Sequence, residues 1–218
     1  EASMILEQDQ AGENTAPHTL SLVEVNEDGY QYWGYYALQS GNGGVGLARS
    51  NDLVNWEKYP SNPLFYNGRF ASVIKVGGTY YMAVTKNYGG TSHVVLRTST
   101  DGLNFTEIAT LVQPVSGQRN QNPNLFLDPN DGQYYLYWFR YSDQRYIMAK
   151  SAANIMDLTT SPELTVLSSP SVLAAPNMMY YDGSYFLSTE IYEGEWKVRI
   201  YESTTSPVSD FVPLPDNP

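Results

Sequence analysis

Seven polar residues in this sequence have side chains that could bind a ligand or move a proton. They are His18, Arg69, Arg119, Asn122, Asn177, Arg140 and Glu190. Amide and guanidinium groups donate hydrogen bonds to hydroxyl and carboxylate oxygens, so the arginines and asparagines suit a ligand that carries such oxygens. Glu190 and His18 are the pair that could act as acid and base. A lone histidine near the start of a strand is, however, more often a hydrogen-bonding residue.

These residues share a position at the ends of short apolar segments. Five of them begin a segment or directly precede it, whereas Arg140 and Glu190 end the segment that returns after a turn. Antiparallel strands joined by a tight turn bring such positions to the same end of a sheet. We therefore expect all seven residues at one end of a set of repeated sheets.

The same hairpin recurs four times along the chain. Each copy has an apolar run, an Asp-Gly or Gly-Gly pair, and a run that begins with an anchor tyrosine: Tyr30, Tyr80, Tyr134 and Tyr185. Asp and Gly tolerate the positive φ of a tight hairpin turn. The copies follow one another at about 50 residues, which is a period typical of propeller blades.

Each unit continues with a third strand and a weaker fourth strand. The third strands are expected at 44–49, 93–98, 146–150 and 197–201. The fourth strands are expected at 56–59, 105–111, 164–167 and 211–214. Four short antiparallel strands at a fixed step indicate a β-propeller. A β-sandwich also has short strands, but it gives no reason for the same hairpin to recur at this step.

We therefore predict an all-β protein, a β-propeller of four recognisable four-stranded blades. The blades are expected at about 18–66, 67–118, 119–172 and 173–218, within a single domain. Residues 1–17 form an N-terminal segment that could add a ring-closing strand around Met4 to Glu7. No segment shows a sustained 3.6-residue period, so very little helix is expected.

The composition excludes several classes of function. The formal net charge is −11 and the pI is near 4.5, which argues against nucleic acid and anionic lipid as partners. The chain has no cysteine and two histidines, so we expect no metal site and no cofactor. It has no apolar run of about 18 residues, so we expect no membrane span. The charge by itself indicates solubility.

A phrase after the third strand of the first unit resembles a known family. It reads Ala48-Arg-Ser-Asn-Asp-Leu-Val-Asn-Trp-Glu57, and the second unit has a degenerate copy that ends at Phe105. Together with the four hairpins, it resembles the blades of the five-bladed glycoside hydrolases of family 43 and its relatives in families 32, 62 and 117. The resemblance covers about His18 to Leu214. It implies either four complete blades or a shortened relative of that propeller.

The motif residues themselves are expected to be structural. Asp52 and Asp101 would cap their turns by accepting backbone N–H bonds. Trp56 and Phe105 would fill the space between neighbouring blades. The resemblance therefore indicates ancestry and fold, and the residues of this phrase are not candidates for catalysis.

The resemblance implies three carboxylates at the axis-facing starts of the innermost strands. Alignment on the hairpins places the first near His18, the second at Asn122 and the third at Ala174. Glycoside hydrolysis needs two carboxyl groups on opposite sides of the scissile bond, about 5 to 10 Å apart. An amide cannot exchange a catalytic proton at neutral pH, so the usual catalytic carboxylates are expected to be replaced.

Three functions remain open at this point. The first is a propeller that binds an oligo- or polysaccharide in the axial funnel without cleaving it, and the replaced carboxylates favour this one. The second is an active glycosidase with relocated acids, for which Glu190 and His18 are the candidates. The third is a structural or assembly module that has no glycan chemistry.

Two further expectations concern the surroundings of the protein. A chain that begins at Glu1 without Met, together with a polysaccharide ligand, indicates an extracellular or periplasmic location. If a blade has been lost from the ring, an exposed blade edge would allow self-association.

Overall fold

The computed structural model describes Leu6 and residues 18–38, 43–87, 90–142 and 145–217. The proposed ring-closing strand around Met4 to Glu7 lies outside this part of the chain, apart from Leu6. The described residues form an all-β structure with four sheets and a single short 3₁₀ helix, η1 (Ile155–Thr159). None of the helical residues in these ranges belongs to a helix long and apolar enough to cross a membrane.

Each sheet is one blade, built from consecutive strands. Blade 1 contains β1 (His18–Glu27), β2 (Tyr30–Leu38), β3 (Gly44–Ser50) and β4 (Glu57–Lys58), with β5 (Phe65–Tyr66) beside β3. Blade 2 contains β6 (Arg69–Val76), β7 (Thr79–Lys86), β8 (His93–Ser99) and β9 (Thr106–Val112). Blade 3 contains β10 (Arg119–Leu127), β11 (Tyr134–Tyr141), β12 (Arg145–Ala152) and β13 (Leu164–Ser169). Blade 4 contains β14 (Val172–Tyr181), β15 (Ser184–Tyr192), β16 (Trp196–Ser203) and β17 (Val212–Pro213).

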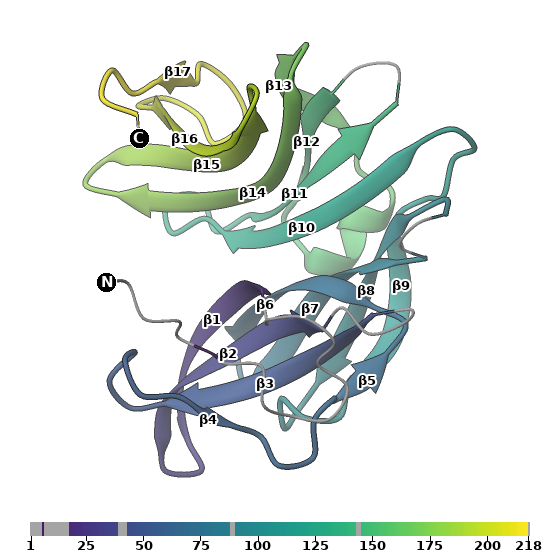
Figure 1. Cartoon of the computed structure of the whole chain (residues 1–218), viewed down its shortest axis with the longest axis vertical. Helices are drawn as coiled ribbons and strands as arrows, with labels where there is room; N and C mark the ends of the chain where they lie inside the picture. Colours follow the sequence, from purple (N-terminus) through teal and green to yellow (C-terminus); the bar gives the residue numbers. More distant parts are fainter. Residues whose placement is uncertain (1–5, 7–17, 39–42, 88–89, 143–144, 218) are drawn as a thin grey trace.

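This arrangement confirms the predicted four-bladed β-propeller. Every neighbouring strand pair within a blade is antiparallel. In Figure 1 the blades follow one another around the view from the lower left, through the right side, to the upper left. The turns between first and second strands have the expected chemistry, because Asp28 and Asp182 have φ of 50° and 47° and the glycines after them also have positive φ.

The apolar core of the protein lies between blades. Between blades 1 and 2, Trp33 stacks on Tyr80 with ring centroids 5.9 Å apart. A second cluster joins blades 2 and 3, and a third joins blades 3 and 4 around Tyr137, Ile147 and Leu187. Since each blade is buried on the faces that meet a neighbour, the fold is stabilised mainly by contacts between consecutive blades.

The innermost strands repeat the same packing from blade to blade, but only three times. β1 packs on β6, β6 on β10, and β10 on β14. Between the described residues of β14 and β1 there is no comparable packing. The ring of four blades is therefore open on the side between blade 4 and blade 1, which we call the open sector.

The phrase that follows the third strand forms the predicted turn. The Asp52 carboxylate accepts hydrogen bonds from the backbone N–H groups of Val54 and Asn55, at 2.9 and 2.7 Å. Asp101 caps the corresponding turn of blade 2 in the same way. These bonds confirm that the two aspartates have a structural role.

The two aromatic residues of the phrase have different surroundings. Phe105 packs edge-on against Tyr35 of blade 1, with ring centroids 5.8 Å apart, as expected for a residue between blades. Trp56 instead covers Gly34 and Leu20 of its own blade, on the face that points away from blade 2. The expectation for Trp56 was wrong in this respect, because no described blade lies on that side.

Candidate functional site

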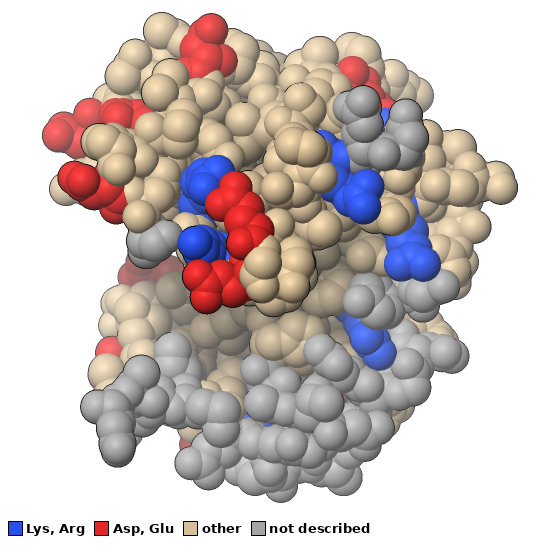
Figure 2. Space-filling model, turned by 45° about the horizontal axis from the view of Figure 1, so that its top comes forward, with Lys and Arg blue, Asp and Glu red and all other residues tan. Residues whose placement is uncertain are grey.

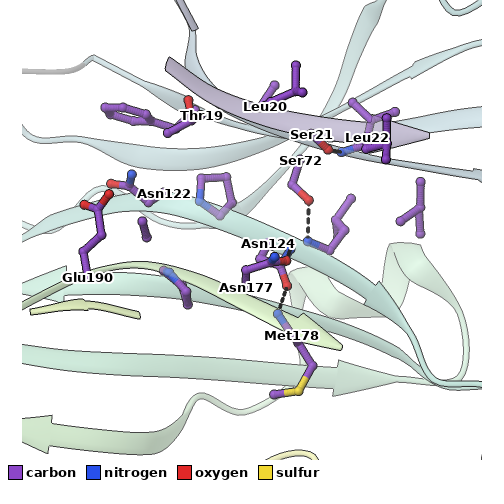
Figure 3. Close-up of a pocket in the computed structure, with 18 residues that line it drawn as sticks. Thr19, Leu20, Ser21, Leu22, Ser72, Asn122, Asn124, Asn177, Met178 and Glu190 are labelled. Atoms are coloured by element: carbon purple, nitrogen blue, oxygen red, sulfur yellow. Dashed lines mark hydrogen bonds between the residues drawn. The ribbon is translucent and has the colours of Figure 1, made fainter. Parts of the chain in front are cut away.

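The four innermost strands surround a cavity of about 530 Å³ at the centre of the ring. Each strand contributes the segment just after its start: residues 19–22, 70–74, 122–125 and 175–178. Glu190 of β15 is the remaining lining residue. Figure 3 shows the lining side chains, with Thr19, Leu20, Ser21 and Leu22 facing those of β10 and β14. The position predicted for a ligand site is thus hollow, and innermost strands form its walls.

A backbone bulge fixes the same point in each innermost strand. The residue there has positive φ in all four blades: Thr19 (52°), Phe70 (55°), Asn122 (51°) and Ala175 (45°). Each strand shifts its register against its hairpin partner at this point. A bulge turns a side chain away from its ordinary pleated direction, and bulges are frequent near active sites. These four residues are therefore structurally equivalent.

The equivalence corrects the first-blade alignment. The counterpart of Asn122 in blade 1 is Thr19, whereas the sequence alignment had pointed to His18. Asn122 itself is held in place from the neighbouring blade, because its backbone N–H donates to the Thr85 hydroxyl at 3.1 Å. In blade 4 the bulge residue is Ala175, which follows Ala174. None of these matched positions carries a carboxylate.

A second polar position lies two residues after each bulge, and it joins consecutive blades. Its side-chain oxygen accepts a hydrogen bond from a backbone N–H of the next innermost strand. The bonds are Val73 N–H to Ser21 Oγ (2.9 Å), Leu125 N–H to Ser72 Oγ (2.9 Å) and Met178 N–H to Asn124 Oδ1 (3.0 Å). In addition, the Asn124 amide donates to Asn177 Oδ1 at 3.1 Å. We call this set the inter-blade hydrogen bonds.

Glu190 is the one charged side chain among the described residues that line the cavity. It lies on β15 opposite Ala174, and it is exposed. Figure 3 shows its carboxylate directed toward Asn122 across the start of the cavity. The rest of the lining is amide, hydroxyl and apolar, so the cavity has one acidic end and an otherwise neutral wall.

Of the seven predicted site residues, three line the cavity: Asn122, Asn177 and Glu190. His18 packs edge-on against Phe70, with ring centroids 5.7 Å apart, and is not part of the lining. Its pairing with Glu190 as acid and base therefore receives no support from the cavity, and it stays a prediction.

The three predicted arginines lie off the cavity lining. Arg140 forms an ion pair of 2.7 Å with Glu163 and donates to the Asn120 side chain at 2.9 Å, within blade 3. Arg69 is buried at the start of β6, against Gly43. Arg119 is exposed, 6.0 Å from the ring of Tyr141. Their roles in binding stay predictions.

Several lining residues escaped the sequence reasoning, namely Thr19, Ser21, Ser72 and Met178. A weak signal was available for two of them. Ser21 and Ser72 are small polar residues inside apolar runs, at nearly the same distance before their anchor tyrosines as Asn124 and Asn177. A search for polar residues at that offset would have found the inter-blade position.

Charged groups are unevenly distributed around the cavity. On the face seen in Figure 2, most acidic side chains gather on the left, and basic ones lie along the middle and the right. Within the described ranges, no group of three His, Asp or Glu side chains is placed to hold a metal ion. The described chemistry of the cavity is therefore that of amides, hydroxyls and one carboxylate.

Comparison with known proteins places these features in a family. The sequence model of the glycosyl hydrolases of family 43 matches residues 20–206. A comparison with curated proteins gave no match. Many solved structures have the same fold, and three of them illustrate the range.

The native arabinanase of Bacillus subtilis is 17% identical, with a TM-score of 0.73, over 95% of this chain and 78% of its own. The endo-arabinase of Bacteroides thetaiotaomicron is 16% identical, with a TM-score of 0.73, over 100% of this chain and 84% of its own. The xylan β-1,4-xylosidase of Bacillus halodurans is 18% identical, with a TM-score of 0.70, over 98% of this chain. This chain spans only 43% of that xylosidase.

Proposed function

Because the chain belongs to glycosyl hydrolase family 43, we propose that its axial cavity binds an oligo- or polysaccharide and that the usual catalytic carboxylates are replaced. The single observation that carries this proposal is the set of bulge residues. Thr19, Asn122 and Ala175 occupy equivalent, axis-facing positions, and neither they nor the adjacent Ala174 carries a carboxylate. The cavity is thus the shape of a sugar site with little acid in it.

The lining suits the two faces of a sugar. Amide groups of Asn122 and Asn177 can donate to and accept from hydroxyl groups, and the Glu190 carboxylate accepts two hydroxyl protons. Leu20, Leu22 and Met178 supply apolar surface on the opposite side of the same cavity. Small-molecule sites commonly combine such apolar walls with a few convergent polar groups.

One carboxylate does not support ordinary glycoside hydrolysis. In that reaction one carboxyl group protonates the leaving oxygen, and a second one acts as base or nucleophile on the other side of the sugar. Glu190 could fill one of these roles, but the described lining offers no second carboxyl group for the other. The proposal is therefore binding without cleavage, and an extracellular or periplasmic location would follow from a polysaccharide ligand.

Binding can be tested by thermal shift and isothermal titration with arabino-, xylo- and fructo-oligosaccharides. A ligand that binds the native state raises the Tm in proportion to its concentration and affinity. We expect at least one of the three series to raise the Tm. We also expect Asn122→Ala to weaken that binding about tenfold, because one to two hydrogen bonds are lost at about 1 kcal/mol each.

Asn26→Ala is the matched control. Asn26 has the same backbone conformation as Asn122, with φ of 54°, but it lies in the β1–β2 hairpin outside the cavity lining. It should leave the affinity unchanged. No Tm shift with any sugar would contradict the proposal. Release of reducing sugar that Glu190→Gln abolishes, while Glu24→Gln does not, would instead establish a glycosidase with a relocated acid.

A further inference from the structure

The open sector interrupts a pattern that the rest of the ring repeats. The inter-blade hydrogen bonds run from blade 1 to 2, from 2 to 3 and from 3 to 4, always between equivalent positions. By the same equivalence, Asn177 is the acceptor that blade 4 presents to a following blade. Leu22 holds the N–H position in blade 1 that Val73, Leu125 and Met178 hold in the others. No described residue joins the Asn177 side chain to the Leu22 N–H.

The forward face of blade 4 exposes apolar side chains that the other blades bury. Ile147 of blade 3 lies opposite the residue five places after its anchor tyrosine, and it is fully buried against blade 4. Val198 holds the same register position in blade 4, opposite Glu190, and it is 47% exposed. Exposed neighbours on this blade are Met179, Tyr181, Trp196 and Val212. Such a contiguous apolar face is typical of an interaction surface.

Blade 1 has a matching exposed face on the other side of the open sector. Gly102, in the turn of blade 2, is buried against Trp33 and Tyr35 of blade 1. Leu53 holds the same place in the turn of blade 1, and it is 41% exposed. Its neighbour Val54 is 74% exposed. Turn residues that contact the preceding blade in blade 2 thus have no such contact in blade 1.

We infer that the open sector receives one further four-stranded blade of the same repeat. Its innermost strand would present a small polar side chain to the Leu22 N–H and a backbone N–H to Asn177 Oδ1. Its two faces would be apolar, one packing on Val198 and Met179 and the other on Leu53 and Trp56. This partner continues an interface that the ring already contains three times, and it would complete the cavity wall between β14 and β1.

The lengths of related structures agree with this inference. The two arabinanases match nearly the whole of this chain, and yet 78% and 84% of their own lengths are covered. Each of them therefore carries further residues beyond the four matched blades. The inference does not depend on the proposed sugar ligand, because it rests on contacts between blades.

The first test asks whether the sector is open in the 218-residue chain. Hydrogen–deuterium exchange followed by NMR should show the Leu22 amide exchanging at least 100-fold faster than the Val73 and Leu125 amides. Equal protection of the three amides would mean that the chain itself fills the sector, and it would overturn the inference. A dimer in analytical ultracentrifugation that Trp196→Lys dissociates would also overturn it, because a second copy would then be the partner.

The second test supplies the partner. Residues 67–118 and, separately, residues 119–172 are fused after Pro218, since these two blades have neighbours on both faces in the ring. We expect at least one fusion to slow exchange of the Leu22 amide at least tenfold and to reduce acrylamide quenching of tryptophan fluorescence. A fusion that carries Val198→Lys should lose both effects. If neither fusion protects Leu22, the inference is wrong.

Discussion

The interface between blades 3 and 4 and the open side of blade 4 are built from equivalent residues in unlike surroundings. At the interface, Tyr137 is fully buried and its hydroxyl donates to the Pro207 carbonyl of blade 4 at 2.7 Å. On the open side, Trp196 is 58% exposed. The difference teaches that a blade face is apolar because of its place in the repeat, whereas its contribution to stability depends on whether a neighbour covers it.

The largest expected effect comes from removing a buried aromatic side chain at a closed interface. Tyr137→Ala should lower the free energy of unfolding by about 3 to 5 kcal/mol, because it leaves a cavity and an unpaired carbonyl. Trp196→Ala should change it by less than about 0.5 kcal/mol, as expected for an exposed residue. Urea denaturation followed by circular dichroism measures both. Equal losses would show that the two faces are equally buried in solution.

The turn phrase gives the next effect in size. A Cβ atom at Gly102 would lie 2.6 Å from Trp33 Cζ3 and 2.8 Å from the Tyr35 hydroxyl oxygen, and φ there is +67°. Gly102→Leu should therefore destabilise the protein by about 2 to 4 kcal/mol, through overpacking and left-handed strain.

Leu53→Gly is the reverse change on the open side. Leu53 has φ of 63°, which glycine adopts more easily, and no blade covers it. The substitution should leave the Tm unchanged or raise it slightly. A loss as large as that of Gly102→Leu would show that Leu53 is packed against a partner, and it would break the comparison.

The inter-blade hydrogen bonds sharpen the comparison at a single atom. Ser72→Ala removes the acceptor of the Leu125 N–H and should cost about 1 to 2 kcal/mol, because a buried donor is left unpaired. Asn177→Ala removes the equivalent side chain at the open side, which accepts only from the exposed Asn124 amide. Its cost in urea denaturation should be well below that of Ser72→Ala. A larger cost would contradict the assignment of Asn177 to an open interface.

The smallest effect concerns pH. Hydrogen bonds from the Asn55 backbone and side chain, and from the Val54 backbone, hold the pKa of Asp52 well below its ordinary value. Burial alone would raise the pKa of Asp101, but hydrogen bonds from Asn104, Ser99 and Leu103 lower it overall. Because both folded-state values are depressed, this stabilisation is present above the ordinary pKa of aspartate and is lost as pH falls toward the folded-state values.

The Tm should therefore decline below about pH 4, the ordinary range of aspartate. Asp101→Asn should flatten this decline more than Asp52→Asn does, since the blade 2 turn packs on blade 1 and the blade 1 turn is exposed. Differential scanning calorimetry between pH 2 and 7 measures it. Identical profiles for the two variants would indicate that the surroundings of the two turns are alike.

Much of the fold could be predicted because its signals are local. The Asp-Gly turns, the anchor tyrosines and the capping aspartates depend on residues that are close in the chain, and the structure has them where the repeat placed them. The candidate site was harder. A single bulge residue decides which side chain faces the axis, and its positive φ at Thr19 or Ala175 has no signature in those residue types.

The sequence by itself determined the repeat, the number of recognisable blades and the absence of carboxylates at the positions that match the family. These follow from residue types at a fixed period, which local physics converts into hairpins. Only the tertiary structure decided that Asn122, Asn177 and Glu190 share one cavity while the arginines do not. It alone also revealed the open sector, because closure of a ring depends on packing between segments that are far apart in the chain.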